Sequence, residues 1–253
     1  MVRKSSDRQW SRFGETDPYW AVLTSEEYRE SNLTDENKRQ FFKSGSVHLE
    51  KITKKIDDMF SIDFSPKKSI DFGCGVGRIV VKLAEISEQV TGVDISPGMI
   101  SEAERNCEER GIENASFVQS SDSLDGLNGK FDFIHSFLVL QHINPNRGYR
   151  IIESLLDRLE DNGIAVLHFT IRGAIGKNGV FRSFFKTRVP LAHNFYNLFK
   201  GEGFFSPYME IHHYDLGRII EILNNKGMSE YFLEGFTDRF GTIGLFLFVR
   251  NQI

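Results

Sequence analysis

The chain has 253 residues, of which 40% are hydrophobic and 26% charged, and these ordinary values exclude wholesale disorder and favour one sizeable α/β core. Its net charge of −4 is compatible with a local basic patch but lacks the overall positive charge of a nucleic-acid-binding protein, so we expect no nucleic-acid partner. The two cysteines do not form the framework of a secreted protein, the first residues lack a signal-peptide pattern, and no apolar run is long enough to span a bilayer. We therefore expect a cytoplasmic protein without stable membrane insertion.

Residues 1–65 predict an N-terminal helical cap that precedes the first strand. Thr24–Glu27 has the pattern of a capping box that opens a short helix. Thr34 is the expected cap of a second helix, and apolar residues spaced from Leu49 to Met59 predict a third. Two interpretations stay open: these helices cover the edge of a sheet, or they close over a cofactor and help to shape a substrate pocket.

A strand, a glycine turn and a helix follow one another directly in residues 69–86. Gly73, Gly75 and Gly77 alternate behind Asp71, and glycines permit positive φ and close approach of a ligand to the backbone. The free N–H groups and the positive dipole end of the following helix suit a nucleotide or a carboxylate. The nicotinamide fingerprint G-x-G-x-x-G does not fit, because the third glycine comes one residue early and Arg78 takes its place.

This Asp-x-Gly-x-Gly-x-Gly order resembles the first motif of the class I S-adenosylmethionine-dependent methyltransferases. In that family the loop surrounds the methionine end of the cofactor. The resemblance implies that Asp71 lies near the cofactor's amino group, directly or through water, and that Gly73, Gly75 and Gly77 give the cofactor room. It also implies S-adenosylmethionine as the cofactor and S-adenosylhomocysteine as the product.

The second strand, Gln89–Ile95, ends in an acidic residue. Asp94 follows the first loop glycine by about 20 residues, the separation that places a carboxylate on the ribose hydroxyls of an adenosine ligand. A strand-end aspartate could instead cap the next helix, but Ser96 and Pro97 already supply a cap and a first-turn proline. We assign Asp94 and its neighbour Ile95 to the cofactor site.

The third strand, Ala115–Gln119, leads into a polar loop. The family places an acidic residue here against the adenine amino group, and Asp122 is the matching position. The alternative is a solvated loop aspartate. We assign Asp122 and Ser123 to the predicted cofactor site.

The fourth strand and its exit, residues 131–143, resemble the family's fourth motif. Ser136, at the strand end, is assigned to the cofactor site. The ending Leu140-Gln141-His142-Ile143 is similar to the branch that acts on small molecules. It differs from the Asn-Pro-Pro-Tyr type of motif in enzymes that methylate base or amide nitrogen.

Alternating strands and helices continue to the C-terminus and predict a parallel sheet covered on both faces. The last two expected strands, Tyr231–Phe236 and Thr242–Val249, resemble the closing pair of the family's seven-stranded sheet. We therefore expect an α/β fold in which residues 66–253 form a doubly wound, mostly parallel seven-stranded sheet with helices on both faces and an antiparallel C-terminal hairpin.

An insertion at about residues 172–213 interrupts this pattern and is rich in phenylalanine and basic residues. It could be a lid over an anionic substrate, a peripheral contact with a membrane or glycolipid, or an amphipathic elaboration packed on the sheet.

Methyl transfer from a sulfonium is an in-line displacement, so positioning in a water-poor pocket can supply much of the catalysis. An alcohol acceptor would also need a base, and His142 is the first candidate, with a purely structural role as the alternative. His135 and His168 are expected in the core. The adjacent pair His212 and His213 makes a poor metal site, and we assign no metal.

The expected function is transfer of a methyl group from S-adenosylmethionine to oxygen or nitrogen of a small molecule, such as a sugar, a natural product, or another anionic or aromatic metabolite. A nicotinamide-dependent oxidoreductase and a non-catalytic cofactor-binding scaffold are the alternatives. The sequence does not indicate the oligomeric state.

Overall fold

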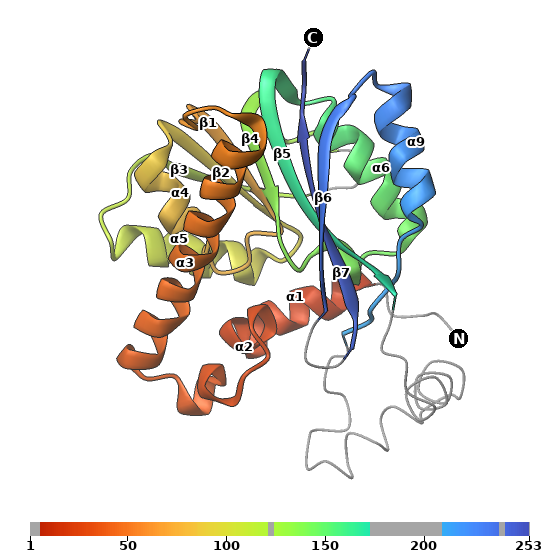
Figure 1. The fold of residues 1–253 in the computed structure, drawn as a ribbon. Coiled ribbons are helices and arrows are strands. Elements are labelled where there is room, and N and C mark those ends of the chain that lie inside the picture. Colours follow the sequence, from red (N-terminus) through yellow and green to blue (C-terminus); the bar gives the residue numbers. More distant parts are fainter. Residues whose placement is uncertain (1–5, 121–123, 173–208, 238–240, 253) are drawn as a thin grey trace, which may run out of the picture.

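Seven strands form a single sheet in the computed structural model, which describes residues 6–120, 124–172, 209–237 and 241–252 (Figure 1). The strands are β1 (Lys68–Phe72), β2 (Gln89–Asp94), β3 (Ala115–Gln119), β4 (Phe131–Ser136), β5 (Leu159–Arg172), β6 (Glu230–Thr237) and β7 (Ile243–Arg250). Their order is β3-β2-β1-β4-β5-β7-β6, with β1 to β5 parallel and β7 antiparallel to both of its neighbours. This arrangement confirms the predicted fold class.

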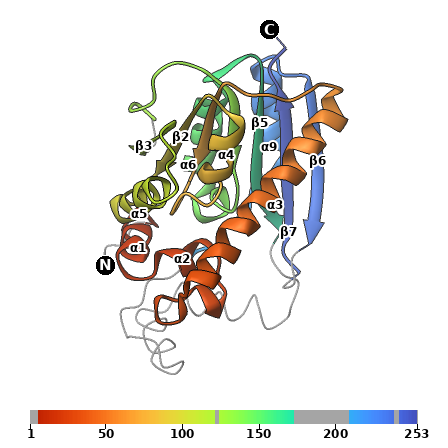
Figure 2. The ribbon, with the colours of Figure 1, turned by 90° about the vertical axis from the view of Figure 1, so that its left-hand side faces the viewer.

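Helices cover both faces of the sheet, which explains why the central strands are apolar without strict alternation (Figure 2). The helices are α1 (Ser6–Thr16), α2 (Pro18–Val22), α3 (Asp35–Phe60), α4 (Val80–Ile86), α5 (Pro97–Glu108), α6 (Pro145–Leu156) and α9 (Leu216–Asn225), with the 3-10 turns η1 (Glu26–Tyr28), η2 (Glu30–Asn32) and η3 (Leu140–His142). One face packs against α3, α4 and α5, and the other against α6 and α9.

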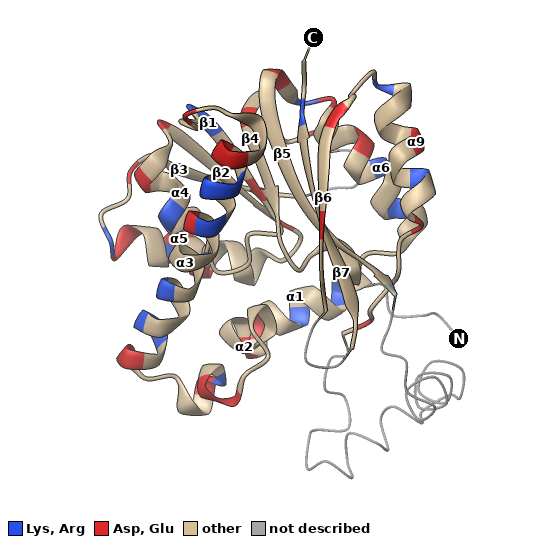
Figure 3. Ribbon diagram, viewed as in Figure 1, with Lys and Arg blue, Asp and Glu red and all other residues tan. Residues whose placement is uncertain are grey.

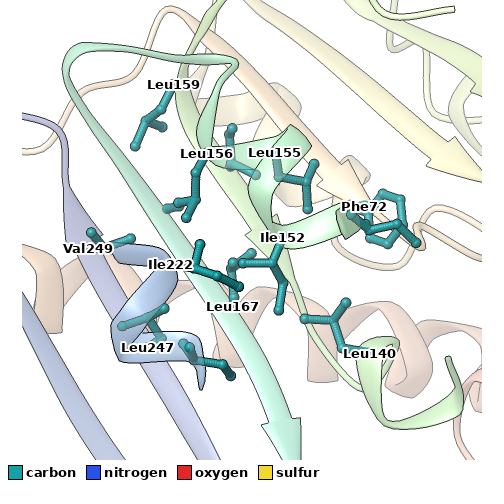
Figure 4. Packing of buried hydrophobic residues seen from close by; sticks show 14 of the residues in the cluster. Phe72, Leu140, Ile152, Leu155, Leu156, Leu159, Leu167, Ile222, Leu247 and Val249 are labelled. Carbon is teal, nitrogen blue, oxygen red and sulfur yellow. The ribbon is translucent and has the colours of Figure 1, made fainter. Parts of the chain in front are cut away.

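The larger core cluster lies under α6 and α9. Figure 4 shows Ile152 of α6 and Ile222 of α9 beside Leu167 of β5, and all three are buried. Each such side chain contributes on the order of 2 kcal/mol by leaving water. Asp215 begins α9 by accepting N–H bonds from the first turn, so the polar end and the apolar face together fix this helix on the sheet.

The prediction of two separate helices between Thr34 and Met59 is wrong, because α3 is one helix of 26 residues. Thr34 does cap it, accepting from the Asn37 N–H at 3.2 Å. Gly45 lies within α3 and does not end it. A Cβ at Gly45 would lie 2.3 Å from the Arg78 carbonyl oxygen, so this glycine is where the helix backbone passes against the glycine loop.

The shorter helices α1 and α2 lie across the carboxyl ends of the parallel strands (Figure 1). Phe13 and Tyr19 from these helices share a buried cluster with Phe41 of α3, Val76 of the glycine loop and Met99 of α5. The cap is therefore packed against the two segments that begin α4 and α5. The division of the chain into a helical cap of residues 1–65 and a domain of residues 66–253 stays a prediction.

Acidic and basic residues both occur along α3, with acidic residues at its two ends (Figure 3). Within the part of the chain that the structure describes, no helix is both long and apolar enough to cross a membrane. Residues 173–208, which hold most of the predicted insertion, lie outside the described residues.

We expect Gly45→Ala to lower the free energy of unfolding by about 1–3 kcal/mol, because the added methyl group collides with backbone that belongs to another element. The loss would exceed the gain in helix propensity from removing a mid-helix glycine. Urea denaturation measures it. Val47→Ala, at a position 40% exposed on the same helix, is the control and should change stability by about 0.5 kcal/mol or less. A Gly45→Ala protein as stable as the wild type would contradict the close approach of α3 to the loop.

Candidate functional site

A cavity of about 360 Å³ lies at the carboxyl ends of the parallel strands, within the size range of small-molecule sites. One part of its wall comes from the glycine loop and the end of β2. These residues are Phe72, Gly73, Gly75, Val93, Asp94, Ile95 and Met99. Another part comes from α1, the exit of β4, the start of α6, the end of β5 and the β6–β7 hairpin. It includes Trp10, Phe137, Leu138, Gln141, His142, Arg147, His168, Thr170, Phe236, Thr242 and Gly244.

All three glycines of the loop adopt the left-handed conformation, with φ of +78° at Gly73, +53° at Gly75 and +83° at Gly77. A side chain is disfavoured at each of these φ values, which explains the alternating pattern in the sequence. The Gly73 N–H donates to the Val93 carbonyl at 2.7 Å, and the Cys74 N–H donates to the same oxygen at 3.0 Å. The loop is thereby fixed to the end of β2.

Two neighbouring segments also close tightly on the loop. A Cβ at Gly73 would lie 2.2 Å from a methyl group of Val139, which follows β4, and one at Gly75 would lie 2.6 Å from a methyl group of Val22 in α2. Both glycines line the cavity, whereas Gly77 packs against Ala103 of α5 and is not part of the wall. The glycines therefore serve close packing as well as ligand space.

Asp94 joins the loop to the end of β2 and faces the cavity. One carboxylate oxygen accepts from the Gly75 N–H at 2.9 Å, and the other accepts from the Ser96 N–H at 2.9 Å. Burial raises the pKa of Asp94 to about 6, against the lowering effect of these N–H donors. The Ser96 hydroxyl caps α5 by accepting from the Met99 N–H, as the sequence predicts, so the remaining lone pairs of Asp94 are available to a ligand.

Asp71 is placed differently from Asp94, because the register sets it opposite His135 of β4. Its carboxylate lies 2.9 Å from the His135 Nδ1, and the His135 Nε2 lies 3.0 Å from the Nε2 of His48 in α3. With Asp71 ionised, His135 donates to it and accepts from His48. The His48 ring stacks on Phe137 at a centroid distance of 4.1 Å, which connects this buried chain to the cavity wall. His135 is buried as predicted, but sequence reasoning missed its bond to Asp71.

Neither Asp71 nor Ser136 is among the residues that line the cavity. The Ser136 hydroxyl is buried and donates to the Phe72 carbonyl at 3.0 Å, which ties β4 to β1. Ile95 does line the cavity, while Asp122 and Ser123 lie outside the described residues. The assignments of Asp71, Ser136, Asp122 and Ser123 to cofactor binding stay predictions.

His142 lies in η3, at the exit of β4, and its ring is 4.9 Å from that of Trp10. Its Nδ1 is 2.7 Å from the Glu210 carbonyl, so this nitrogen carries the proton. The Nε2 lies 3.0 Å from the amide nitrogen of Gln141 and accepts from it. Burial lowers the pKa of His142 to about 4, so the ring is neutral at pH 7 and presents an acceptor nitrogen at the cavity.

His168 of β5 is buried in the core, as the sequence predicts, but it also lines the cavity. Its Nδ1 accepts from the Leu138 N–H at 3.2 Å. Leu138 has a φ of +64°, an uncommon value for a residue other than glycine. The histidine thus supports a strained turn in the segment that follows β4.

No group of three or more histidine, cysteine or carboxylate side chains comes together as a metal site within the described residues.

Residues 70–163 match a family model described as a methyltransferase domain. Residues 70–163 therefore form a methyltransferase domain. The mitochondrial ubiquinone biosynthesis O-methyltransferase of Schizosaccharomyces pombe is 32% identical over 106 residues, which are 41% of this chain and 38% of that protein. The corresponding enzyme of Methylococcus capsulatus is 32% identical over 78 residues, 30% of this chain and 33% of that protein. The matches therefore span about two fifths or less of these relatives.

Solved structures share the methyltransferase fold along nearly the whole chain. Magnesium protoporphyrin IX methyltransferase from Synechocystis, solved with bound S-adenosylhomocysteine, has a TM-score of 0.63 at 18% identity and covers 96% of this chain and 97% of that one. The N-methyltransferase NodS from Bradyrhizobium japonicum has a TM-score of 0.59 at 15% identity, covering 98% and 99%. At these identities the likeness establishes the fold alone.

We expect His135→Leu to destabilise the methyltransferase domain by about 3–5 kcal/mol, because it leaves the buried carboxylate of Asp71 without this donor. Denaturant unfolding of the single and double variants measures the coupling between the two residues. The double variant Asp71→Asn with His135→Leu should lose less than the sum of the single changes, since the charge is then absent. Strictly additive losses would show that the two side chains do not act as a pair.

Proposed function

We propose that this protein transfers a methyl group from S-adenosylmethionine to an oxygen or nitrogen of a small molecule. The observation that carries the proposal is the position of Asp94, which holds the glycine loop through the Gly75 N–H and faces the same cavity as that loop. One carboxylate thus orders the backbone around the cofactor and keeps lone pairs for its ribose hydroxyls.

The residues at this end of the cavity fit the cofactor in shape and in chemistry. Gly73 and Gly75 remove side chains from the wall where the methionine end would lie, and Asp94 would accept from the ribose. Val93, Ile95 and Met99 supply apolar wall for the adenine. When bound, S-adenosylmethionine supplies an electrophilic methyl group on a sulfonium.

The remaining wall would bind and orient the methyl acceptor. This part of the wall has aromatic surface from Trp10, Phe137 and Phe236. Ile211, which is 53% exposed, adds apolar surface where the cavity meets solvent. Arg147 also lines this part, but its guanidinium is engaged with both carboxylate oxygens of Asp7, at 2.9 and 3.2 Å. This composition favours an apolar, ring-containing acceptor and excludes bulk water from the reacting atoms.

We propose His142 as the base when the acceptor must lose a proton. Its proton sits on Nδ1, toward Glu210, so Nε2 is the basic nitrogen, and the acceptor hydroxyl would take the place of the Gln141 amide. A nitrogen acceptor with a free lone pair needs no such step.

The sheet disfavours the oxidoreductase alternative. The usual dinucleotide-binding sheet is mostly parallel and has the strand order 3-2-1-4-5-6, whereas here the antiparallel β7 lies between β5 and β6. A turnover assay on a metabolite library separates an enzyme from a non-catalytic scaffold. An enzyme releases S-adenosylhomocysteine with at least one compound of the library, and a scaffold releases it with none.

Asp94→Asn is expected to weaken S-adenosylhomocysteine binding by about 5- to 100-fold, which corresponds to about 1–3 kcal/mol for hydrogen bonds to a charged acceptor. In the wild type the ribose hydroxyls favour the ionised carboxylate, whose pKa is about 6 without ligand. Affinity should therefore fall as the pH is lowered through 6, and the Asn variant should lose this dependence. Calorimetry between pH 7.5 and 5 measures both effects.

Glu104→Gln removes an exposed carboxylate from α5 and is the matched control, with the pH dependence of the wild type expected. A folded Asp94→Asn protein that binds as tightly as the wild type would refute the ribose assignment.

His142→Ala is expected to lower turnover of a hydroxyl acceptor by about 10²- to 10⁴-fold, the usual contribution of a positioned base. Because burial holds the pKa of this histidine near 4, wild-type turnover at saturating S-adenosylmethionine should fall as the pH drops through about 4 and not near 6.5. Initial rates of S-adenosylhomocysteine release, measured with the first acceptor that the library identifies, test both statements. Unchanged turnover in the Ala variant would leave His142 a structural role.

A further inference from the structure

His168 holds a hydrogen-bond donor that has no partner in the described part of the chain. Its Nδ1 accepts from the Leu138 N–H at 3.2 Å, so the proton of the neutral ring is on Nε2. The Nε2 is buried and bonds to no described atom. Buried donors are nearly always paired in native proteins, so an unpaired one at a cavity wall indicates a missing partner.

This N–H lies beside Gly244 of β7, which has no side chain. A Cβ at Gly244 would lie 2.9 Å from the His168 Nε2, and the Phe236 ring stacks on the His168 ring at 5.3 Å. Gly244, Phe236 and His168 all line the cavity. The N–H therefore lies beside a residue without a side chain and next to the ring of Phe236, a residue that is 36% exposed.

The protonation and orientation of His168 are fixed before any ligand arrives. Leu138 adopts a φ of +64°, and its N–H is held by the His168 Nδ1. Burial lowers the pKa of His168 to about 3, so the ring stays neutral and keeps its Nε2–H through the physiological range. A preorganised donor of this kind discriminates between ligands that carry an acceptor and those that do not.

We propose that the His168 Nε2–H donates to an oxygen of the methyl acceptor, and that the acceptor is an aromatic ring bearing a phenolate, carbonyl or carboxylate oxygen. The ring is inferred from Phe137 and Phe236, which flank His168, and the oxygen from the unpaired donor. The inference deepens the proposed function and rests on it. His168 would be a specificity-determining residue, while proton removal stays with His142.

Two substitutions separate the two nitrogens of His168. In His168→Asn, the side-chain oxygen takes the place of Nδ1 and can still accept from Leu138, but nothing replaces the Nε2–H. In His168→Gln, the amide can reach the Nε2 position and donate there, but the support of Leu138 is lost. The Asn variant therefore tests recognition, and the Gln variant tests the turn.

The probe is 4-nitrophenolate, whose absorbance changes when its oxygen accepts a hydrogen bond, and 4-nitrotoluene is the matched ligand without that oxygen. Titrations use the full chain at a pH where the phenol is ionised, with and without S-adenosylhomocysteine. We expect His168→Asn to weaken 4-nitrophenolate binding at least tenfold and to leave 4-nitrotoluene within twofold of the wild type. His168→Gln should retain a preference for the phenolate over 4-nitrotoluene.

Equal binding of 4-nitrophenolate to the wild type and to His168→Asn would overturn the proposal, as would wild-type protein that does not bind the phenolate. If the Asn variant does not fold, ¹⁵N NMR of the wild-type histidines decides. The His168 Nε2–H signal must shift with 4-nitrophenolate and not with 4-nitrotoluene, and an unmoved signal refutes the inference. Failure of the proposed function is distinguishable, because it appears as absent S-adenosylhomocysteine binding whatever the phenolate does.

Discussion

The hydrogen bond from the Gly75 N–H to the Asp94 carboxylate is the interaction on which the site depends. It links the loop after β1 to the end of β2. The hydrogen bonds from the Gly73 and Cys74 N–H groups to the Val93 carbonyl connect the same two segments. Left-handed backbone without this support would sample many conformations, since glycine loses more entropy on ordering than any other residue. The position of Asp94 therefore decides both the shape of the loop and the charge that the loop faces.

The N-terminal helices contact both the face of the sheet and the cavity at the strand ends, so the two interpretations of the first 65 residues are compatible. α3 covers the sheet, with Gly45 against the Arg78 carbonyl and His48 bonded to His135. α1 and α2 lie over the strand ends, where Trp10 and Val22 line the cavity. Because His48 also stacks on Phe137, the same helix that covers the sheet supports the wall of the cavity.

The sequence was sufficient for features that are local. The succession of strands and helices from β1 to α6, the glycine loop, the end of β2 and the Ser96 cap depend on short-range patterns of hydrophobicity, glycine and proline, and all agree with the structure. The antiparallel closing pair of the sheet was expected from the family resemblance and not from such patterns. The pairing of Asp71 with His135 was not predictable, because it follows from the register of two strands that are 64 positions apart. The continuity of α3 was missed for a similar reason, since Gly45 is explained by a contact with a distant loop.

The antiparallel β7 explains why the part of the cavity that we propose for the acceptor contains residues from the end of the chain. In a wholly parallel sheet the last strand would begin at the edge opposite the cavity. Here β6 ends, and β7 begins, beside the carboxyl end of β5, with Thr237 opposite Ile243 and Ile243 opposite Arg172. The strand direction thus brings Phe236, Thr242 and Gly244 against His168 and the cavity. Under the proposed function, the loops after β1 and β2 would bind the cofactor, and changes in the hairpin would alter acceptor choice without disturbing the Gly75–Asp94 bond.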